Sequence, residues 1–264
     1  MGLKDLFSRS GRGKSRVDRL AKRVVNQYAQ SAERYGAMED LIKLAADSWA
    51  KAEKLDAGAP ERAQLEQQCE DAYVAVLKRF TVNASKTIDD EEEKGWLYRR
   101  LTAIGKPLLP AIKRFCLEAE GIAWALRIVE DVANESEEWD LLDALIEKHP
   151  PEYERDSSNK LQMLTHLREI DDPRVRDILA RYLADPDENV RFHCIEALVQ
   201  NGEEESKQAL VEHLDNPKED SLRLRSRIQD GLADLGWDLS EYASIVRKHV
   251  DEDHSFDGKK LARR

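Results

Sequence analysis

The residues of this chain that could carry chemistry are few, and their spacing matches no catalytic or metal-binding motif. The six histidines are His149, His166, His193, His213, His249 and His254. No two of them lie four residues apart and none is followed by Glu, so no helical metal site built on His-Glu pairs is predicted. Cys69, Cys116 and Cys194 lie among regularly spaced apolar residues, which indicates buried and unreactive thiols. No Ser or Cys is spaced from a His and a carboxylate in a way that indicates a nucleophile. We therefore expect no catalytic residue, no metal and no cofactor.

Three short segments resemble functional motifs only in part. Gly13-Lys14-Ser15 is similar to the end of a phosphate-binding loop, but Ser8 stands where that loop needs a Gly and no strand precedes it. Met1-Gly2 suggests N-myristoylation, but Leu6 occupies the position of the usual Ser or Thr. Asp251–His254 contains three acids and a His, which favours a solvated acidic tail over a cation site.

The elements that must position any site are helices throughout. Apolar residues recur three and four positions apart along almost the whole chain, and no convincing alternating run indicates a strand. Asp172-Pro173 has the composition of a helix start, and Gly105, Gly202 and Gly236 stand where helices are expected to end. Most of these helices are about 10–16 residues long with short connections, a spacing typical of helical repeats.

The repeat can be tested by its register. When Gly202 is aligned with Gly236, Arg191 falls on Arg225 and the apolar positions of the two helices coincide. The same alignment carried towards the N-terminus places Lys160 and Lys94 at the position of these arginines. Five second helices therefore share one apolar pattern. Since a single pair of helices cannot bury its apolar face alone, neighbouring pairs are expected to stack.

One repeat carries a family resemblance. The segment from Leu183 through Asp185-Pro186 and Val190-Arg191 to Gly202 resembles the HEAT repeat, in its bacterial form also called the phycobilisome-lyase-type HEAT-like repeat. The segment from Asn216-Pro217 to Gly236 is similar to a second copy. The resemblance is good for residues 173–236, fair for 65–172 and weak for 15–64.

The resemblance implies an all-α fold, an α-solenoid in which roughly five HEAT-like helical pairs form a right-handed superhelix. The expected organisation is a basic tail at 1–15, an N-terminal helical cap or degenerate repeat at 16–64, a repeat domain at 65–250 and a charged tail at 251–264. In the family, a turn Asp and a helix Arg form a ladder between repeats. Carried over, Asp185 would contact Arg191 or Arg225.

The shared register also predicts a binding surface. In stacked helical pairs the second helices line the concave wall, and their outward positions form columns across the repeats. The first column contains Trp96, Trp124, Gln162, His193 and Arg227. The second column contains Arg99, Arg127, Thr165, Glu196 and Asp230. Aromatic and Arg side chains on one concave wall are typical of interaction hot spots. The competing hypothesis is that Trp96 and Trp124 are half-buried between helices.

Charge and composition restrict the partner. The net charge is −11, and residues 1–30 alone carry +6, which leaves −17 for residues 31–264. So acidic a body disfavours nucleic-acid binding, whereas the basic N-terminal segment could contact an acidic partner or an anionic surface. An odd number of cysteines favours a reducing compartment, and we expect a cytoplasmic protein. No apolar run approaches the length of a membrane span.

We therefore predict a non-catalytic adaptor or scaffold that binds another protein on the concave face of its solenoid. The alternative is a HEAT-like lyase-type enzyme, or an enzyme accessory factor, acting on a small molecule or chromophore. Neither the partner nor the oligomeric state follows from the sequence.

Overall fold

The computed structural model describes residues 16–84 and 86–264, which form two compact units, one ending at Lys148 and the other beginning at His149. The first unit opens with a helical stretch at 16–24. Its further elements are α2 (Ser31–Ala52), α3 (Pro60–Leu77), η1 (Lys78–Thr81), α4 (Thr87–Thr102), η2 (Lys106–Leu108), α5 (Leu109–Glu118), α6 (Ala123–Val132) and α7 (Glu135–Lys148). The predicted basic tail at 1–15 lies outside the described residues.

The second unit contains six helices, two short 3₁₀ turns and one hairpin. These are α8 (Ser158–Leu167), α9 (Pro173–Tyr182), α10 (Glu188–Asn201), η3 (Glu204–Ser206), α11 (Lys207–Leu214), α12 (Leu222–Leu235), η4 (Ser240–Tyr242), α13 (Ala243–His249), β1 (His254–Phe256) and β2 (Leu261–Arg263). The boundary between the two units lies inside the predicted repeat domain at 65–250, and α3 begins before the predicted boundary at 64.

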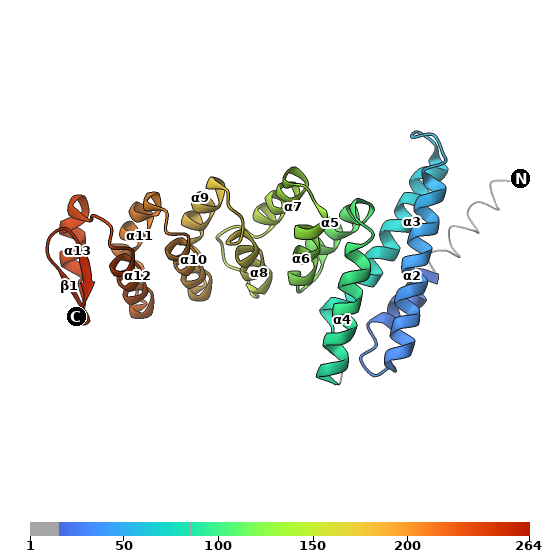
Figure 1. Cartoon of the computed structure of the whole chain (residues 1–264), viewed down its shortest axis with the longest axis horizontal. Coiled ribbons are helices and arrows are strands. Elements are labelled where there is room, and N and C mark those ends of the chain that lie inside the picture. The colour runs from blue at the N-terminus through green and yellow to red at the C-terminus, as the bar shows by residue number, and fades with distance from the viewer. Residues whose placement is uncertain (1–15, 85) are drawn as a thin grey trace, which may run out of the picture. The chain divides into compact units, whose positions relative to one another are not determined.

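Each unit consists of two layers of helices (Figure 1). In the first unit α5 lies beside both α3 and α7 in one layer, and α4 contacts both α2 and α6 in the other. In the second unit α10 lies between α8 and α12, while α9 and α11 pack against α10 and α12 from the other layer. The predicted all-α solenoid fold is confirmed.

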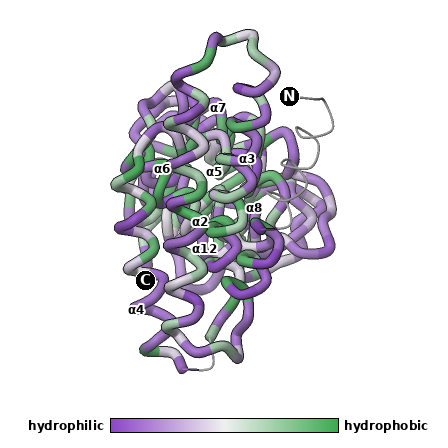
Figure 2. The backbone as a smooth tube through the Cα atoms, turned by 90° about the vertical axis from the view of Figure 1, so that its right-hand side faces the viewer, coloured by the Kyte–Doolittle hydropathy of each residue, from purple (hydrophilic) through white to green (hydrophobic). Residues whose placement is uncertain are grey.

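Burial of the helical stripes explains why the layers form. Hydrophobic and hydrophilic stretches alternate along the helices (Figure 2). In the second unit, Val175, Leu179 and Tyr182 of α9 are almost fully buried, at the three- and four-residue spacing that indicated a helix. The apolar faces of the two layers therefore meet in one core within each unit.

The helix ends use the predicted residues. The side chain of Asp172 accepts a hydrogen bond from the backbone N–H of Arg174, and Pro173 occupies the first turn of α9. Gly202 and Gly236 end α10 and α12 in the left-handed conformation, with φ of 66° and 62°. A residue with a side chain would be strained there, so these glycines end the helices for a backbone reason.

Five buried charged side chains connect α2, η1 and α4 in the first unit. Arg34 of α2 donates hydrogen bonds to both carboxylate oxygens of Glu93. Arg79 of η1 donates to Asp90 at 2.6 Å and also to Glu93. Lys94 lies 2.8 Å from the second Asp90 oxygen. Burial alone would raise the pKa of Asp90, but the hydrogen bonds from Lys94, the Ala84 backbone and Arg79 outweigh it and lower that pKa to about 2.

The C-terminal segment differs from the charged tail predicted at 251–264. β1 pairs antiparallel with β2, and β2 packs against α12. Gly258, with φ of 102°, lies in the turn between the strands. His254 is buried and its Nδ1 lies 2.6 Å from the carboxylate of Asp251, while Leu261 is buried at the start of β2. The segment therefore folds because it covers α12, a contact that local charge composition does not reveal.

Candidate functional site

The predicted columns of the second unit lie on α8, α10 and α12, and their members contact one another diagonally. His193 Nε2 of α10 lies 3.2 Å from the hydroxyl oxygen of Thr165 on α8. The Thr165 hydroxyl donates to the Leu161 carbonyl, so the His193 ring is the donor in this contact. Glu196 of α10 forms an ion pair with Arg227 of α12. Each contact joins the second column of one helix to the first column of the next.

The C-terminal hairpin continues the same diagonal. Asp230 of α12 accepts a hydrogen bond from Arg263 of β2 at 2.9 Å, and Arg263 also contacts Asp234 at 2.8 Å. β2 thus takes the place beside α12 that a further second helix would have. The acids Glu196 and Asp230 are therefore paired within the chain, which weakens the purely acidic end predicted for the second column.

Gln162 and His193 add uncharged polar groups to this surface. Gln162 is half-buried on α8. Burial lowers the pKa of His193, and the nearby positive charge of Arg168 adds to that shift. The imidazole of His193 is consequently neutral at pH 7 and serves as a hydrogen-bond donor on this surface.

In the first unit, Trp96 and Arg99 lie on α4. The Trp96 ring meets the Tyr35 ring of α2 edge-on, with centroids 4.8 Å apart and planes at 80°. Trp96 is half-buried by this contact, whereas Arg99 is exposed. Trp96 therefore packs between helices, as the competing hypothesis expected for it.

Trp124 and Arg127 of α6 belong to an aromatic–arginine cluster, which we define as Phe80, Tyr98, Trp124 and Arg127. The Trp124 ring stacks on buried Phe80, with centroids 5.2 Å apart and planes at 12°. It also lies 6.0 Å from the Tyr98 ring of α4. The Arg127 guanidinium lies 4.8 Å from the Tyr98 centroid and 5.6 Å from that of Trp124. These distances are typical of cation–π contacts.

The predicted columns do not contain Tyr98. It lies two residues after Trp96, about 200° around the helix, and so faces α6 where Trp96 faces α2. Its hydroxyl donates to Asp131 of α6, which raises the pKa of Tyr98. The structure therefore brings Trp124 and Arg127 together with Tyr98, not with Trp96. The sequence signal that could have identified Tyr98 is a second aromatic residue two positions after Trp96 on the same helix.

The structure corrects the partners of the predicted ladder. The Asp185 carboxylate accepts from Lys160 Nζ at 2.7 Å, while Arg191 donates to the backbone carbonyl of Asp185 at 2.9 Å. The carboxylate partner of Arg191 is Glu219, at 2.7 Å. Arg225 donates to the backbone carbonyl of Glu219 at 2.6 Å. A ladder between repeats was predicted with the Asp185 side chain contacting Arg191 or Arg225, whereas that carboxylate pairs with Lys160 of the preceding repeat and Arg191 pairs with Glu219 of the next turn.

One rule describes both complete rungs of this ladder. The base on a second helix donates to a carbonyl of the turn before its own helix and to the acid of the next turn. Lys160 does so with the Glu152 carbonyl and Asp185, and Arg191 does so with the Asp185 carbonyl and Glu219. The predicted ladder did not include Lys160 or Glu219. Lys160 occupies the basic position shared by the second helices, and Glu219 lies 34 residues after Asp185, the same offset as between Gly202 and Gly236, so both could have been found from the sequence.

Glu219 is the most connected acid of the ladder. Burial by itself would raise its pKa, but the Arg191 guanidinium and the backbone N–H of Ser221 outweigh burial, so the pKa of Glu219 is lowered. His213 Nε2 lies 3.0 Å from the same carboxylate, and burial lowers the pKa of His213. The ladder thus holds neighbouring repeats in register through buried, paired charges.

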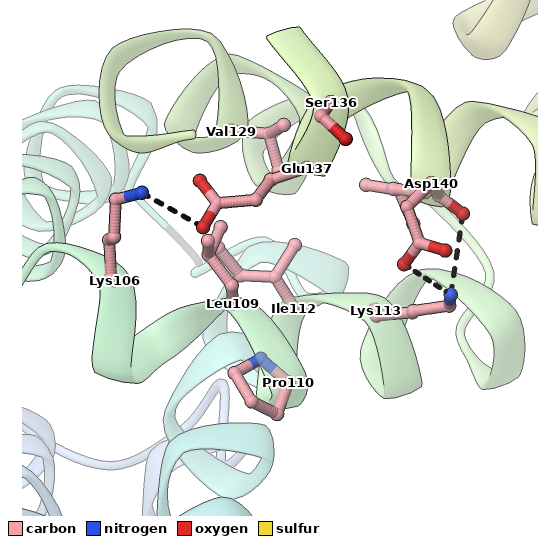
Figure 3. Close-up of a pocket in the computed structure, with 10 residues that line it drawn as sticks. Lys106, Leu109, Pro110, Ile112, Lys113, Val129, Ser136, Glu137 and Asp140 are labelled. Carbon is pink, nitrogen blue, oxygen red and sulfur yellow. Dashed lines mark hydrogen bonds and ion pairs between the residues drawn. The ribbon is translucent and has the colours of Figure 1, made fainter. Parts of the chain in front are cut away.

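A groove of about 620 Å³ lies on the other layer of the first unit, between α5 and α7 (Figure 3). Its apolar lining includes Leu109 and Ile112 of α5. Glu137 of α7 reaches across to Lys106, and Asp140 reaches to Lys113, at 2.9 and 2.6 Å. Both acids are already neutralised by a lysine, so the groove offers apolar surface framed by two ion pairs.

The remaining chemistry-bearing residues lie apart from this groove. The three cysteines are buried, and burial raises the pKa of Cys69 to about 11 and that of Cys116 to about 12. Within residues 16–84 and 86–264, no group of three or more His, Cys, Asp or Glu side chains is placed to hold a metal ion. None of the helices in these residues has both the length and the apolar character needed to cross a bilayer.

Comparison with known proteins adds one finding. Residues 140–229, from α7 to α12, match the family model described as HEAT repeats. Neither the curated proteins nor the solved structures contain a match to the chain. The match covers the buried ladder and the closest repeats of the register, and the finer likeness to lyase-type repeats stays a prediction. The chain therefore contains HEAT repeats, which the family model recognises at residues 140–229.

Proposed function

We propose that this protein is a non-catalytic adaptor that binds another protein through the second helices of its repeats. Stacked helical repeats present extended side-chain surfaces to partners, and the second helices α4 and α6 carry the exposed Arg99 and Arg127. In this proposal the protein catalyses no reaction, and its ligand is another protein.

The observation that carries this proposal is the aromatic–arginine cluster. Trp, Tyr and Arg are the residue types enriched at interaction hot spots. Trp124 is held by its stacking on Phe80, and Tyr98 is held by its hydrogen bond to Asp131. Because these rings are already held in place, the protein loses little side-chain conformational entropy when a partner binds to them.

The exposed arginines define the partner's chemistry. Arg127 covers the cluster with its guanidinium, and Arg99 is exposed on the neighbouring helix α4. A guanidinium stacked on aromatic rings keeps its N–H donors directed outwards for a carboxylate. The expected partner segment therefore places an acidic side chain beside an apolar one.

The α8–α10–α12 surface contributes in a different way. Its Glu196–Arg227 and Asp230–Arg263 pairs are satisfied within the chain, so a partner gains little by contacting them. Such a surface supplies shape and polar complementarity around a hot spot, while most of the affinity comes from the hot spot itself.

The test begins with affinity purification of the tagged full chain from its source cells and identification of a stoichiometric partner. Calorimetry with that partner then compares the native protein with Arg127→Glu and with Lys51→Glu, an exposed control on α2. We expect Arg127→Glu to weaken binding by about 30-fold or more, as for a hot-spot residue, and Lys51→Glu to leave it unchanged. Both variants should stay folded, and Arg127→Glu should lower the melting temperature only slightly, because cation–π contacts of an exposed arginine contribute about 0.5–1 kcal/mol.

Two results would overturn the adaptor function. The first is an unchanged affinity of Arg127→Glu for the partner. The second is a purified protein that captures no protein and carries a bound small molecule or chromophore by native mass spectrometry, which would favour the lyase-type enzyme. Trp96→Ala is a poorer probe than Arg127→Glu, because the Tyr35 contact makes a loss of stability unavoidable.

A further inference from the structure

The helical stretch at 16–24 presents a row of bases to solvent. Arg16, Arg19, Lys22 and Arg23 are all exposed, and Asp18 is the single acid among residues 16–24. At 100° per residue the four bases fall within an arc of about 120°. They extend over roughly 10 Å of helix length. The four bases therefore form one linear positive row, which we call the basic row.

The opposite side of this stretch is fixed to the first unit. Val17, Leu20 and Val24 are buried at three- and four-residue spacing. A cavity of about 240 Å³ lies between this stretch, α3 and α5, with Val17 and Ala21 in its lining. Because the apolar side is packed, the basic row is held in a fixed direction and does not belong to a free segment.

The bases of the basic row are not paired with acids within the described residues. None of the four side chains forms a salt bridge with another described residue, Asp18 included. This contrasts with Lys160 and Arg191 of the ladder and with the bases of the α2–η1–α4 network, which form ion pairs. Residues 31–264 carry a net charge of −17, so the row concentrates positive charge on a strongly acidic protein.

An exposed aromatic residue follows the basic row in the chain. Tyr28, four residues after the helical stretch, is 84% exposed. Its ring is therefore available to a partner that the basic row attracts.

We propose that the basic row is a docking surface for an anionic lipid bilayer. An unpaired row of Arg and Lys matches the negative surface potential of acidic phospholipids. The exposed Tyr28 ring, which follows the row in the chain, suits the interfacial zone of a bilayer, where Tyr is enriched. Positive charge and an interfacial aromatic side chain together strengthen peripheral binding. This surface is independent of the proposed protein-binding cluster.

The size of the effect follows from the number of bases. Each base near an anionic surface strengthens binding roughly 5-fold. Removing two charges from the row should therefore weaken vesicle binding roughly 25-fold. Salt should weaken it as well, because exposed charges are screened within about 10 Å at 0.1 M and about 3 Å at 1 M ionic strength.

The experiment is sedimentation of the full chain with vesicles of pure phosphatidylcholine or of phosphatidylcholine with about 30 mol% phosphatidylglycerol. The test variant is Arg19→Gln/Lys22→Gln. The matched control is Lys51→Gln/Lys54→Gln, which removes the same charge from exposed positions at the end of α2. Circular dichroism and melting temperature check that both remain folded. A gel shift with duplex DNA and single-stranded RNA runs in parallel.

Support requires binding to the anionic vesicles alone, the roughly 25-fold loss in the test variant and no loss in the control. Equal binding to both kinds of vesicle, no binding to either, or equal losses in the test and control variants would overturn the proposal. Salt-sensitive nucleic-acid binding without vesicle binding would also overturn it and would assign the row to a phosphate backbone instead.

Discussion

A methyl group added at Gly231 should disturb the contact between α10 and α12. The Cβ of an alanine at this position would lie 2.4 Å from Val199 Cγ2 and 3.0 Å from Val199 Cγ1. Carbon atoms in contact normally stay about 3.5–4.0 Å apart, so one of the two helices must shift by roughly 1 Å. Val199 cannot turn away easily, because a β-branched side chain in a helix has one strongly preferred rotamer.

Two opposing terms set the magnitude. Ala is better than Gly in a helix interior by about 1 kcal/mol. Overpacking a tight contact costs about 1–3 kcal/mol. Gly231→Ala should therefore destabilise the α10–α12 contact by up to about 2 kcal/mol. Gly36→Ala is the matched control: Gly36 is exposed in α2 with no atom within 4 Å of the added Cβ, so the same substitution should stabilise α2 by up to about 1 kcal/mol.

The measurement must be local, because a chain with two compact units need not unfold in one step. Native-state hydrogen exchange of α10 and α12 amides gives the free energy of opening of this contact, and the α2 amides report the control. Repeating Gly231→Ala in a Val199→Ala background completes a double-mutant cycle. Removing both Val199 methyl groups removes the closest contacts, so alanine at 231 should then be tolerated, with a coupling of about 1–3 kcal/mol.

Two outcomes would refute this reasoning. One is a Gly231→Ala variant whose α10 and α12 amides become more protected, as those of α2 should in Gly36→Ala. The other is the absence of coupling between positions 199 and 231, which would mean that the two helices relax apart without cost.

Three further predictions concern buried charges and thiols. Glu219→Gln should destabilise the second unit by about 3–5 kcal/mol, because it leaves Arg191 without its buried carboxylate. Glu203→Gln, which breaks the half-buried Arg176–Glu203 pair, should change stability by less than about 1 kcal/mol, and thermal melts compare the two variants. The Asp90 pKa is lowered from 3.8 to about 2, so its stabilisation of about 2 kcal/mol is present above pH 4 and is lost as the pH falls from 4 towards 2. Hydrogen exchange of α4 across that range should show this loss, and a flatter response is expected in Asp90→Asn. The thiols of Cys116 and Cys194 should react with a thiol reagent only after denaturation, because burial raises both pKa values; rapid labelling of the native protein would contradict their burial.

The helices were predictable because their signals are local. Apolar spacing shows which face of each helix is buried, and Asp172, Gly202 and Gly236 mark helix ends through their own backbone conformation and nearby hydrogen bonds. The shared register indicated stacked helical repeats, and the resemblance of residues 183–202 to the HEAT repeat is confirmed by the family match at 140–229. The hairpin at 254–263 was missed because each strand has only three residues, too few for an alternating pattern to be recognised.

The candidate surface was only partly predictable. The columns placed Thr165, His193 and Arg227 on neighbouring second helices, but which residue contacts which depends on how one helix is displaced along its neighbour. In the first unit that displacement and rotation select Tyr98, not Trp96, as the neighbour of Trp124. An error of one residue in the alignment of two helices turns the predicted direction of a side chain by about 100°. An alignment of apolar positions is not accurate enough to exclude such an error.

The sequence by itself determined that this protein is a series of amphipathic helices with defined ends, and that the helices repeat. Periodicity and capping depend on residues within a few positions of one another, so no knowledge of the rest of the chain is needed. Tertiary structure alone decided the pairing of Lys160 with Asp185 and of Arg191 with Glu219, and the close approach at Gly231. These contacts join residues 25 to 32 positions apart, and their geometry exists only after the helical layers have packed against each other.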